Sequence, residues 1–167
     1  MVISIAFLSK RIRLFLFDIF ACVAKKRPDA YPILVGDGER KEQIREKEQN
    51  LALESRVIFT GVRSDISALL SAFDVFLFPS FYEEMPNTVI EAQATGLPRL
   101  ISDTITKEVD ISGLVQHMPL TASPEQWTEK AMKCVSQERE DVKESFLREK
   151  YDIESVVEEF VRRSLFD

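Results

Sequence analysis

The sequence predicts a doubly wound α/β fold, in which helices cover both faces of a parallel sheet. Short β-rich runs alternate with helical segments along the chain. The runs are almost wholly apolar, as in Val75–Phe78, and strands of this kind are buried between two helical layers. Gly, Pro, Ser or Asp bound each run, as is common at strand ends. Right-handed crossovers through helices join such strands.

The expected strands are short and regularly spaced. A weaker first strand is expected at Val2–Ala6, and clearer ones at Tyr31–Val35, Val57–Thr60, Val75–Phe78 and Arg99–Ser102. A further strand is expected at Leu114–Gln116, directly before His117, the only histidine. One histidine cannot build a His-rich metal site, so we interpret His117 as a surface or packing residue.

Helices are expected between these strands. The spacing of one helix face appears in Lys10–Lys26, at Ile12, Leu16, Ile19, Phe20 and Val23. The highly charged Glu39–Ala52 indicates a solvated surface helix, and Ser64–Phe73 opens with the capping residue Ser64. From Ser123 onward the pattern is helical, with Pro124 at a first helical position and a final amphipathic helix at Ile153–Leu165.

The first helix carries more apolar surface than one packed side can cover, because Leu14–Phe17 places apolar groups on several of its faces. We expect the excess to face an N-terminal domain outside this chain. One alternative is contact with an anionic membrane, aided by Lys10, Arg11 and Arg13. The other is ordinary burial against the C-terminal helix.

Composition sets the broad class. The chain has 167 residues, a length at which we expect one domain, 1–167, with a helical C-terminal extension over about 123–167. The net charge of −6 argues against a nucleic-acid partner, because binding a nucleic acid depends on neutralising its phosphates with Lys and Arg. Cys22 and Cys134 form neither a disulfide framework nor a zinc knuckle, and no apolar stretch approaches the ~20 residues of a membrane span. We expect a cytoplasmic protein, with peripheral contact to the inner face of the membrane as an alternative.

In open parallel sheets, ligands bind beyond the carboxyl ends of the strands. The segments that follow the strands are small, polar or flexible: Gly36–Glu39, Gly61–Asp65, Pro79–Asn87 and Ser102–Thr104. For any single turn the plain interpretation is structural. No phosphate-binding loop of the ATPase type occurs, and Gly36-x-Gly38 lacks the third glycine of a dinucleotide site.

The segment Tyr82–Pro98 is more specific. Glu83 and Glu91 stand seven residues apart, with a helix start expected at Pro86 or Asn87 between them. The free N–H groups of that helix start would bind a phosphate, and both carboxylates would border it. A phosphate held by amides and flanked by carboxylates that accept from hydroxyls indicates a nucleotide-sugar site.

Four motifs resemble one family. Phe81–Pro98 resembles the Glu-x7-Glu signature of the retaining group 1 (family 4) glycosyltransferases. Val35–Glu39, Val57–Asp65 and Phe73–Ser80 fall in that family's order and spacing, and Ser102–Asp110 is similar to its bacterial exopolysaccharide and capsule branch. The resemblance covers about residues 14–120. It implies the donor-binding C-terminal domain of the two-domain GT-B fold.

The resemblance also implies roles. Glu91 would accept hydrogen bonds from the ribose, and Glu83 would contact the transferred sugar. The backbone over Met85, Pro86, Asn87, Thr88 and Val89 would meet the diphosphate, and Val62 and Arg63 would lie beside the base, with Gly36 and Gly38 on the same edge. No metal or other cofactor is implied, so the nucleotide diphosphate sugar is the only small-molecule partner expected.

One departure bears on catalysis. The family usually carries Gly-Arg at the end of the first strand and a Lys a few residues on, where this chain has Ile5, Ala6 and Arg11. Arg11 can replace the charge of the lysine, but Ala6 supplies none, and losing one such charge costs roughly 3–4 kcal/mol. Glu84 adds a negative side chain near the phosphates. The catalytic candidates are therefore Glu83 and Arg11.

The leading hypothesis is the donor domain of a retaining glycosyltransferase of polysaccharide biosynthesis, with uridine diphosphate as the expected nucleotide. An N-terminal acceptor domain or a separate chain would supply the other half of the cleft. The alternative is a non-catalytic nucleotide-sugar-binding or interaction module. A third hypothesis, a sugar-nucleotide epimerase of the same fold, is disfavoured by the single His117.

Overall fold

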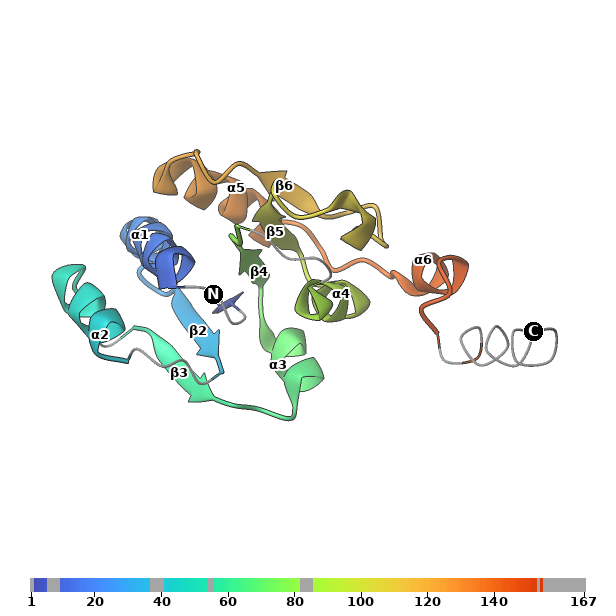
Figure 1. The fold of residues 1–167 in the computed structure, drawn as a ribbon, viewed down its shortest axis with the longest axis horizontal. Helices are drawn as coiled ribbons and strands as arrows, with labels where there is room; N and C mark the ends of the chain where they lie inside the picture. The colour runs from blue at the N-terminus through green and yellow to red at the C-terminus, as the bar shows by residue number, and fades with distance from the viewer. Residues whose placement is uncertain are drawn as a thin grey trace.

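The described residues of this computed structural model form one parallel sheet with helices on both faces (Figure 1). They are residues 2–5, 10–36, 41–53, 56–81, 86–152 and 154, with backbone alone for 2–5, 10–13 and 41–43. Ala6, Gly38, Glu83, Glu84, Met85 and nearly all of the predicted helix Ile153–Leu165 lie outside the described residues.

The sheet has the strand order β3-β2-β1-β4-β5-β6, and every pairing between strands is parallel. The strands are β1 (Val2–Ile5), β2 (Tyr31–Val35), β3 (Ile58–Gly61), β4 (Val75–Phe78), β5 (Arg99–Ser102) and β6 (Gln116–Met118). This confirms the predicted class. β6 begins two residues later than expected, which places His117 within the strand, opposite Ile101 of β5.

The helices divide between the two faces as right-handed crossovers require. The helices α1 (Lys10–Lys26), α2 (Lys41–Asn50) and α5 (Pro124–Val135) cover one face, and α3 (Ile66–Ala72) and α4 (Asn87–Ala94) cover the other (Figure 1). A short 3-10 helix, η1 (Lys107–Val109), precedes β6. The helix α6 (Lys143–Arg148) lies at the periphery, beyond α4 (Figure 1).

The core lies where the central strands meet both layers. Every residue of β4 and β5 is buried, as the apolar runs predicted. The predicted inner face of α1 is also buried at Leu16, Ile19, Phe20 and Val23. The expectation that every apolar strand is buried fails at β3, where Ile58 and Phe59 are 45% and 48% exposed. β3 is an edge strand and has a neighbouring strand on one side only.

The excess apolar surface of α1 is covered within the chain. Phe17 is fully buried, and the half-buried Phe15 packs edge to face on Trp127 of α5, with ring centroids 6.1 Å apart. The Thr128 hydroxyl also donates to the Ile19 carbonyl at 3.2 Å. Contacts within the chain therefore account for these two rings, and contact of α1 with a missing domain or a membrane stays a prediction. The covering helix is α5, which lies alongside α1 on the same face of the sheet (Figure 1).

Two predicted helix starts have different outcomes. Ser123 forms a full capping box: its hydroxyl accepts from the Gln126 amide, and the Gln126 side chain accepts from the Ser123 amide. Ser64 is not the cap of α3, which begins at Ile66 with Asp65 as its N-cap. The Asp65 carboxylate is held by Arg63 instead of capping the helix.

The end of α4 is tightly fixed. Gly96, with φ +64°, closes a Schellman motif. The Gly96 amide donates to the backbone carbonyl of Gln93, and the Leu97 amide donates to the backbone carbonyl of Ala92. The Arg139 guanidinium also donates to the Thr95 carbonyl at 2.8 Å and to carbonyls at the end of α3, including that of Leu70 at 2.9 Å. One cation therefore satisfies acceptors at the carboxyl ends of two helices.

Gly96→Ala should destabilise the fold more than Gly113→Ala. Both glycines have positive φ, which costs a residue with a Cβ about 1–2 kcal/mol. At Gly96 the added Cβ would also lie 2.4 Å from the Glu140 carbonyl oxygen, whereas at Gly113 it meets no atom within 4 Å. We expect the crowding to cost about 1–3 kcal/mol more. Urea unfolding of both variants measures the difference, and equal losses would contradict the crowding.

Candidate functional site

The carboxyl edge of the sheet contains a topological switch point between β1 and β4. These strands are neighbours, but β1 leads into α1 on one face and β4 leads toward α4 on the other. Adjacent connections that diverge in this way leave a crevice, where ligands bind in open α/β sheets. Arg11 lies in the first turn of α1 and so at this edge, and only its backbone is described.

The start of α4 lies at the same edge. Pro86 is the N-cap and is buried, and neither its side chain nor an acidic residue of the first turn occupies the helix end. The Val89 amide donates to the Pro86 carbonyl at 2.8 Å. The first amides of a helix lack intrahelical acceptors. Among the described residues, none is recorded as an acceptor for the Asn87 or Thr88 amide, and amides in this position favour an anion.

Glu91 lies about one turn into α4, and its side chain is exposed. The opposite side of the helix is inserted in the core, with Val89, Ala92 and Gln93 fully buried. This arrangement matches the expectation from the sequence that the carboxylate lies near the helix start. Its predicted partner Glu83 is outside the described residues.

A second group of predicted residues meets at the ends of β2 and β3. The Gly36 amide donates to the Gly61 carbonyl at 2.7 Å, and both glycines have positive φ. This bridge places Gly36 beside the segment that begins with Val62, whose side chain is 76% exposed. The structure therefore brings Gly36, Val62 and Arg63 to one corner of the carboxyl edge.

Arg63 is held in place by Asp65. Its guanidinium donates twice to the carboxylate, from Nε at 2.8 Å and from Nη2 at 2.5 Å. These hydrogen bonds raise the pKa of Arg63 and lower the pKa of Asp65 below its usual value. The guanidinium of Arg63 therefore contacts Asp65 in the same loop that carries Val62.

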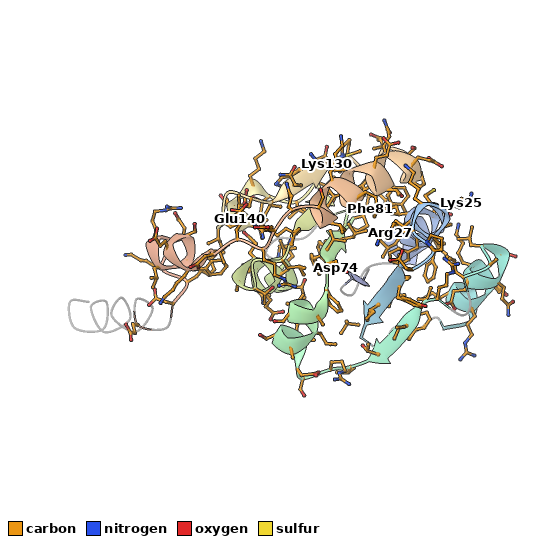
Figure 2. All side chains as sticks on the ribbon, turned by 180° about the vertical axis from the view of Figure 1, so that it is seen from behind. Lys25, Arg27, Asp74, Phe81, Lys130 and Glu140 are labelled. Atoms are coloured by element: carbon orange, nitrogen blue, oxygen red, sulfur yellow. The ribbon has the colours of Figure 1, made fainter. Side chains whose placement is uncertain are left out.

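Sequence reasoning missed a group of hydroxyls at the ends of β4 and β5. Ser102 donates its hydroxyl to the Ser80 carbonyl, and Thr104 donates to the same oxygen at 2.6 Å. Figure 2 labels two residues that flank β4: Asp74, just before its first residue, and Phe81, which follows Ser80 beyond its last. The bonds fix the chain where it leaves β4. The available signal was the run of small hydroxyl residues at the ends of neighbouring strands.

His117 lies away from the residues at the ends of β2 and β3. His117 lies in β6, at the far edge of the sheet. Within the described ranges, no three His, Cys, Asp or Glu residues come close enough to hold a metal ion. No helix in the same ranges is long and apolar enough to cross a membrane.

A sequence profile described as "Glycosyl transferases group 1" matches residues 2–137. The chain belongs to this family. EpsF of Bacillus subtilis, named as a candidate glycosyltransferase, is 38% identical over 129 residues, which are 75% of this chain and 34% of EpsF. An Escherichia coli UDP-Gal:alpha-D-GlcNAc-diphosphoundecaprenol alpha-1,3-galactosyltransferase is 42% identical over 77 residues, 46% of this chain and 20% of the enzyme. The chain thus spans at most about a third of these relatives.

Solved structures show the same fold. The C-terminal domain of LpcC from Francisella tularensis, a group 1 family protein, has a TM-score of 0.71 at 19% identity, covering 91% of this chain and 86% of that domain. Staphylococcus aureus TarM has a TM-score of 0.79 at 21% identity, and the match covers 96% of this chain and 34% of TarM. Anabaena HepE gives 0.67 at 22% identity, covering 81% of this chain and 39% of HepE. The predicted Rossmann-like domain is confirmed.

Arg63→Ala should raise the pKa of Asp65 toward its ordinary value. With Arg63 present, the depressed pKa means that the pair's contribution is complete above the unfolded pKa, near 3.9, and is lost only as the pH falls through the lower folded value. A carboxyl-carbon NMR titration measures the change. Asp29 is the internal control, because its pKa is lowered by Arg27 at the same spacing and should not move. An unmoved Asp65 would show that Arg63 is not the cause.

Proposed function

We propose that the chain is the donor-binding domain of a retaining glycosyltransferase, and that it binds a nucleoside diphosphate sugar at the carboxyl edge of the sheet. The observation that carries the proposal is the start of α4, where first-turn amides at the switch point are followed one turn later by an exposed carboxylate, Glu91. Membership of the group 1 family supports the transfer of a sugar as the reaction class.

The diphosphate would lie at the N-terminus of α4. The amides of Asn87 and Thr88 and the positive end of the helix dipole favour an anion there. Arg11, in the first turn of α1, would balance the charge on the leaving diphosphate. Stabilising that charge needs no metal ion.

The nucleoside would extend from α4 toward the ends of β2 and β3. Glu91 would accept hydrogen bonds from the ribose hydroxyls, and the base would lie against Val62 and the guanidinium of Arg63, with Gly36 allowing close approach of the backbone. The roles of Glu83 toward the sugar and of Gly38 and Met85 toward the nucleotide remain proposals from the sequence.

Uridine diphosphate is the proposed nucleotide. HepE was crystallised with UDP and glucose, TarM with UDP, and the Escherichia coli relative is named for UDP-Gal. A relative from Salmonella typhi, 29% identical over 155 residues, is a Vi polysaccharide biosynthesis protein. These relatives support a role in polysaccharide biosynthesis. The acceptor half of the cleft would be supplied by an N-terminal domain or a separate chain.

A non-catalytic binding module is the second candidate. Ala6 and Glu84 favour it, because they stand where the family usually has Arg and commonly has Gly near the phosphates. Such a module would bind the donor at the same residues and would lack transfer even with an acceptor domain present.

The isolated chain should bind UDP and UDP-sugars weakly and should transfer no sugar. In the proposed two-domain arrangement the isolated chain would form one side of the cleft, so it would lack the water exclusion and positioning that domain closure provides. Titration calorimetry with UDP, UDP-sugars and GDP-sugars measures binding, and product analysis with an added acceptor measures transfer. Absence of any nucleotide binding would contradict the proposal, and robust transfer would contradict the assignment as half an enzyme.

Glu91→Ala should weaken UDP binding by about 1.5–3 kcal/mol, the scale of hydrogen bonds to a charged group. Glu83→Ala should spare UDP and weaken only the UDP-sugar. Glu46→Ala, at an exposed site on α2, is the matched control and should change neither affinity. Equal losses for both ligands in both site variants would show that the two roles are assigned wrongly.

A further inference from the structure

Gln93 is a fully buried amide on the helix that carries Glu91. Its Nε2 donates to the Val109 carbonyl at 2.7 Å. Its Oε1 accepts from both the amide and the hydroxyl of Ser112, each at 3.1 Å. Both ends of one planar group are thus bonded to the segment that runs from the end of η1 toward β6.

That segment is itself fixed. Asp110 Oδ1 accepts from the Leu114 amide at 3.1 Å and from the Val115 amide at 3.2 Å. The buried Arg99 of β5 donates to the Leu97 carbonyl at 2.9 Å and to the Ser112 hydroxyl. Burial lowers the pKa of Arg99 to about 10, so it remains charged at neutral pH. Gln93 therefore joins α4 to a frame built on β5.

The rest of the buried face of α4 is apolar. Val89 and Ala92 hold the helix against the core, but apolar burial is non-directional and tolerates small rotations about the helix axis. Hydrogen bonds weaken steeply when they are misaligned. Because Gln93 is bonded through both its oxygen and its nitrogen, a rotation of α4 would disturb both contacts together.

Glu91 and Gln93 are two residues apart, which is about 200° around a helix of 3.6 residues per turn. The direction fixed for Gln93 inside the core therefore fixes the direction of Glu91 on the opposite side. We infer that Gln93 is a positioning residue that aims the Glu91 carboxylate at the nucleotide, an inference that rests on the proposed role of Glu91.

A merely structural amide would support stability and leave nucleotide affinity unchanged. The two roles separate in a double-mutant cycle of Gln93→Met and Glu91→Ala, with the dissociation constant of UDP measured by calorimetry. Thermal unfolding checks that each variant is folded at the titration temperature. Thr128→Val is the matched control: Thr128 is also a buried polar residue with two carbonyl acceptors, but it lies in α5 on the opposite face of the sheet.

We expect Gln93→Met to weaken UDP binding about three- to tenfold in the parent chain and less than twofold in the Glu91→Ala chain. Thr128→Val should lower the unfolding temperature and leave UDP affinity unchanged. If Gln93→Met does not fold, Ser112→Ala removes one bond to the same amide oxygen. It should give about a twofold loss that also disappears in the Glu91→Ala chain.

The same loss with and without Glu91, or no loss at all, would overturn the inference while leaving the proposed function intact. An unchanged UDP affinity in Glu91→Ala alone would overturn the proposed role of Glu91, and with it the role of Gln93. A loss in Thr128→Val equal to that in Gln93→Met would show that general destabilisation explains the effect, and would also overturn the inference.

Discussion

The complete burial of β4 and β5 is the constraint on which the rest of the structure depends. A strand such as Val75–Phe78 has apolar side chains on both faces, and each gains about 1.5–3 kcal/mol only if its own face is covered. Helices must therefore lie on both sides of the sheet. Because crossovers are right-handed, helices on opposite faces require connections that run in opposite directions from the centre. The crevice at the carboxyl edge follows from that division.

The helix α4 belongs to the core and to the candidate site at the same time. Its buried side packs through Val89 and Ala92, and its exposed side carries Glu91. A helix of eight residues has little stability of its own, so its placement comes from its neighbours. Gln93 binds it to the frame around Ser112, and Arg139 holds its carboxyl end. Directional contacts of this kind suit a helix that has to present a carboxylate at a set angle.

The sequence predicts the fold well where the signals are local. The bounds of α1, β2, β4 and β5 agree with the structure because apolar runs and helix periodicity stop at Gly, Pro, Ser and Asp. The capping box at Ser123 is local too. The failures are contacts between distant segments, such as Trp127 covering Phe15 and Arg139 reaching the end of α3. In the site, the position of Glu91 one turn into α4 was predicted from the motif. The partners of Gln93 were not predicted, because Val109 and Ser112 lie on another segment that no pattern in the sequence links to α4.

The sheet order also bears on how the chain folds. β1 pairs with β2, and β4 pairs with β5, each across a single intervening helix, but β1 meets β4 through contacts such as Ile3 with Val75 that close a long loop. Contacts of high sequence separation carry the largest loop-closure entropy and tend to form late. The two βαβ halves can therefore form first and join along the β1–β4 seam. Since the candidate site lies at the end of that seam, it is complete only when the last long-range pairing is made.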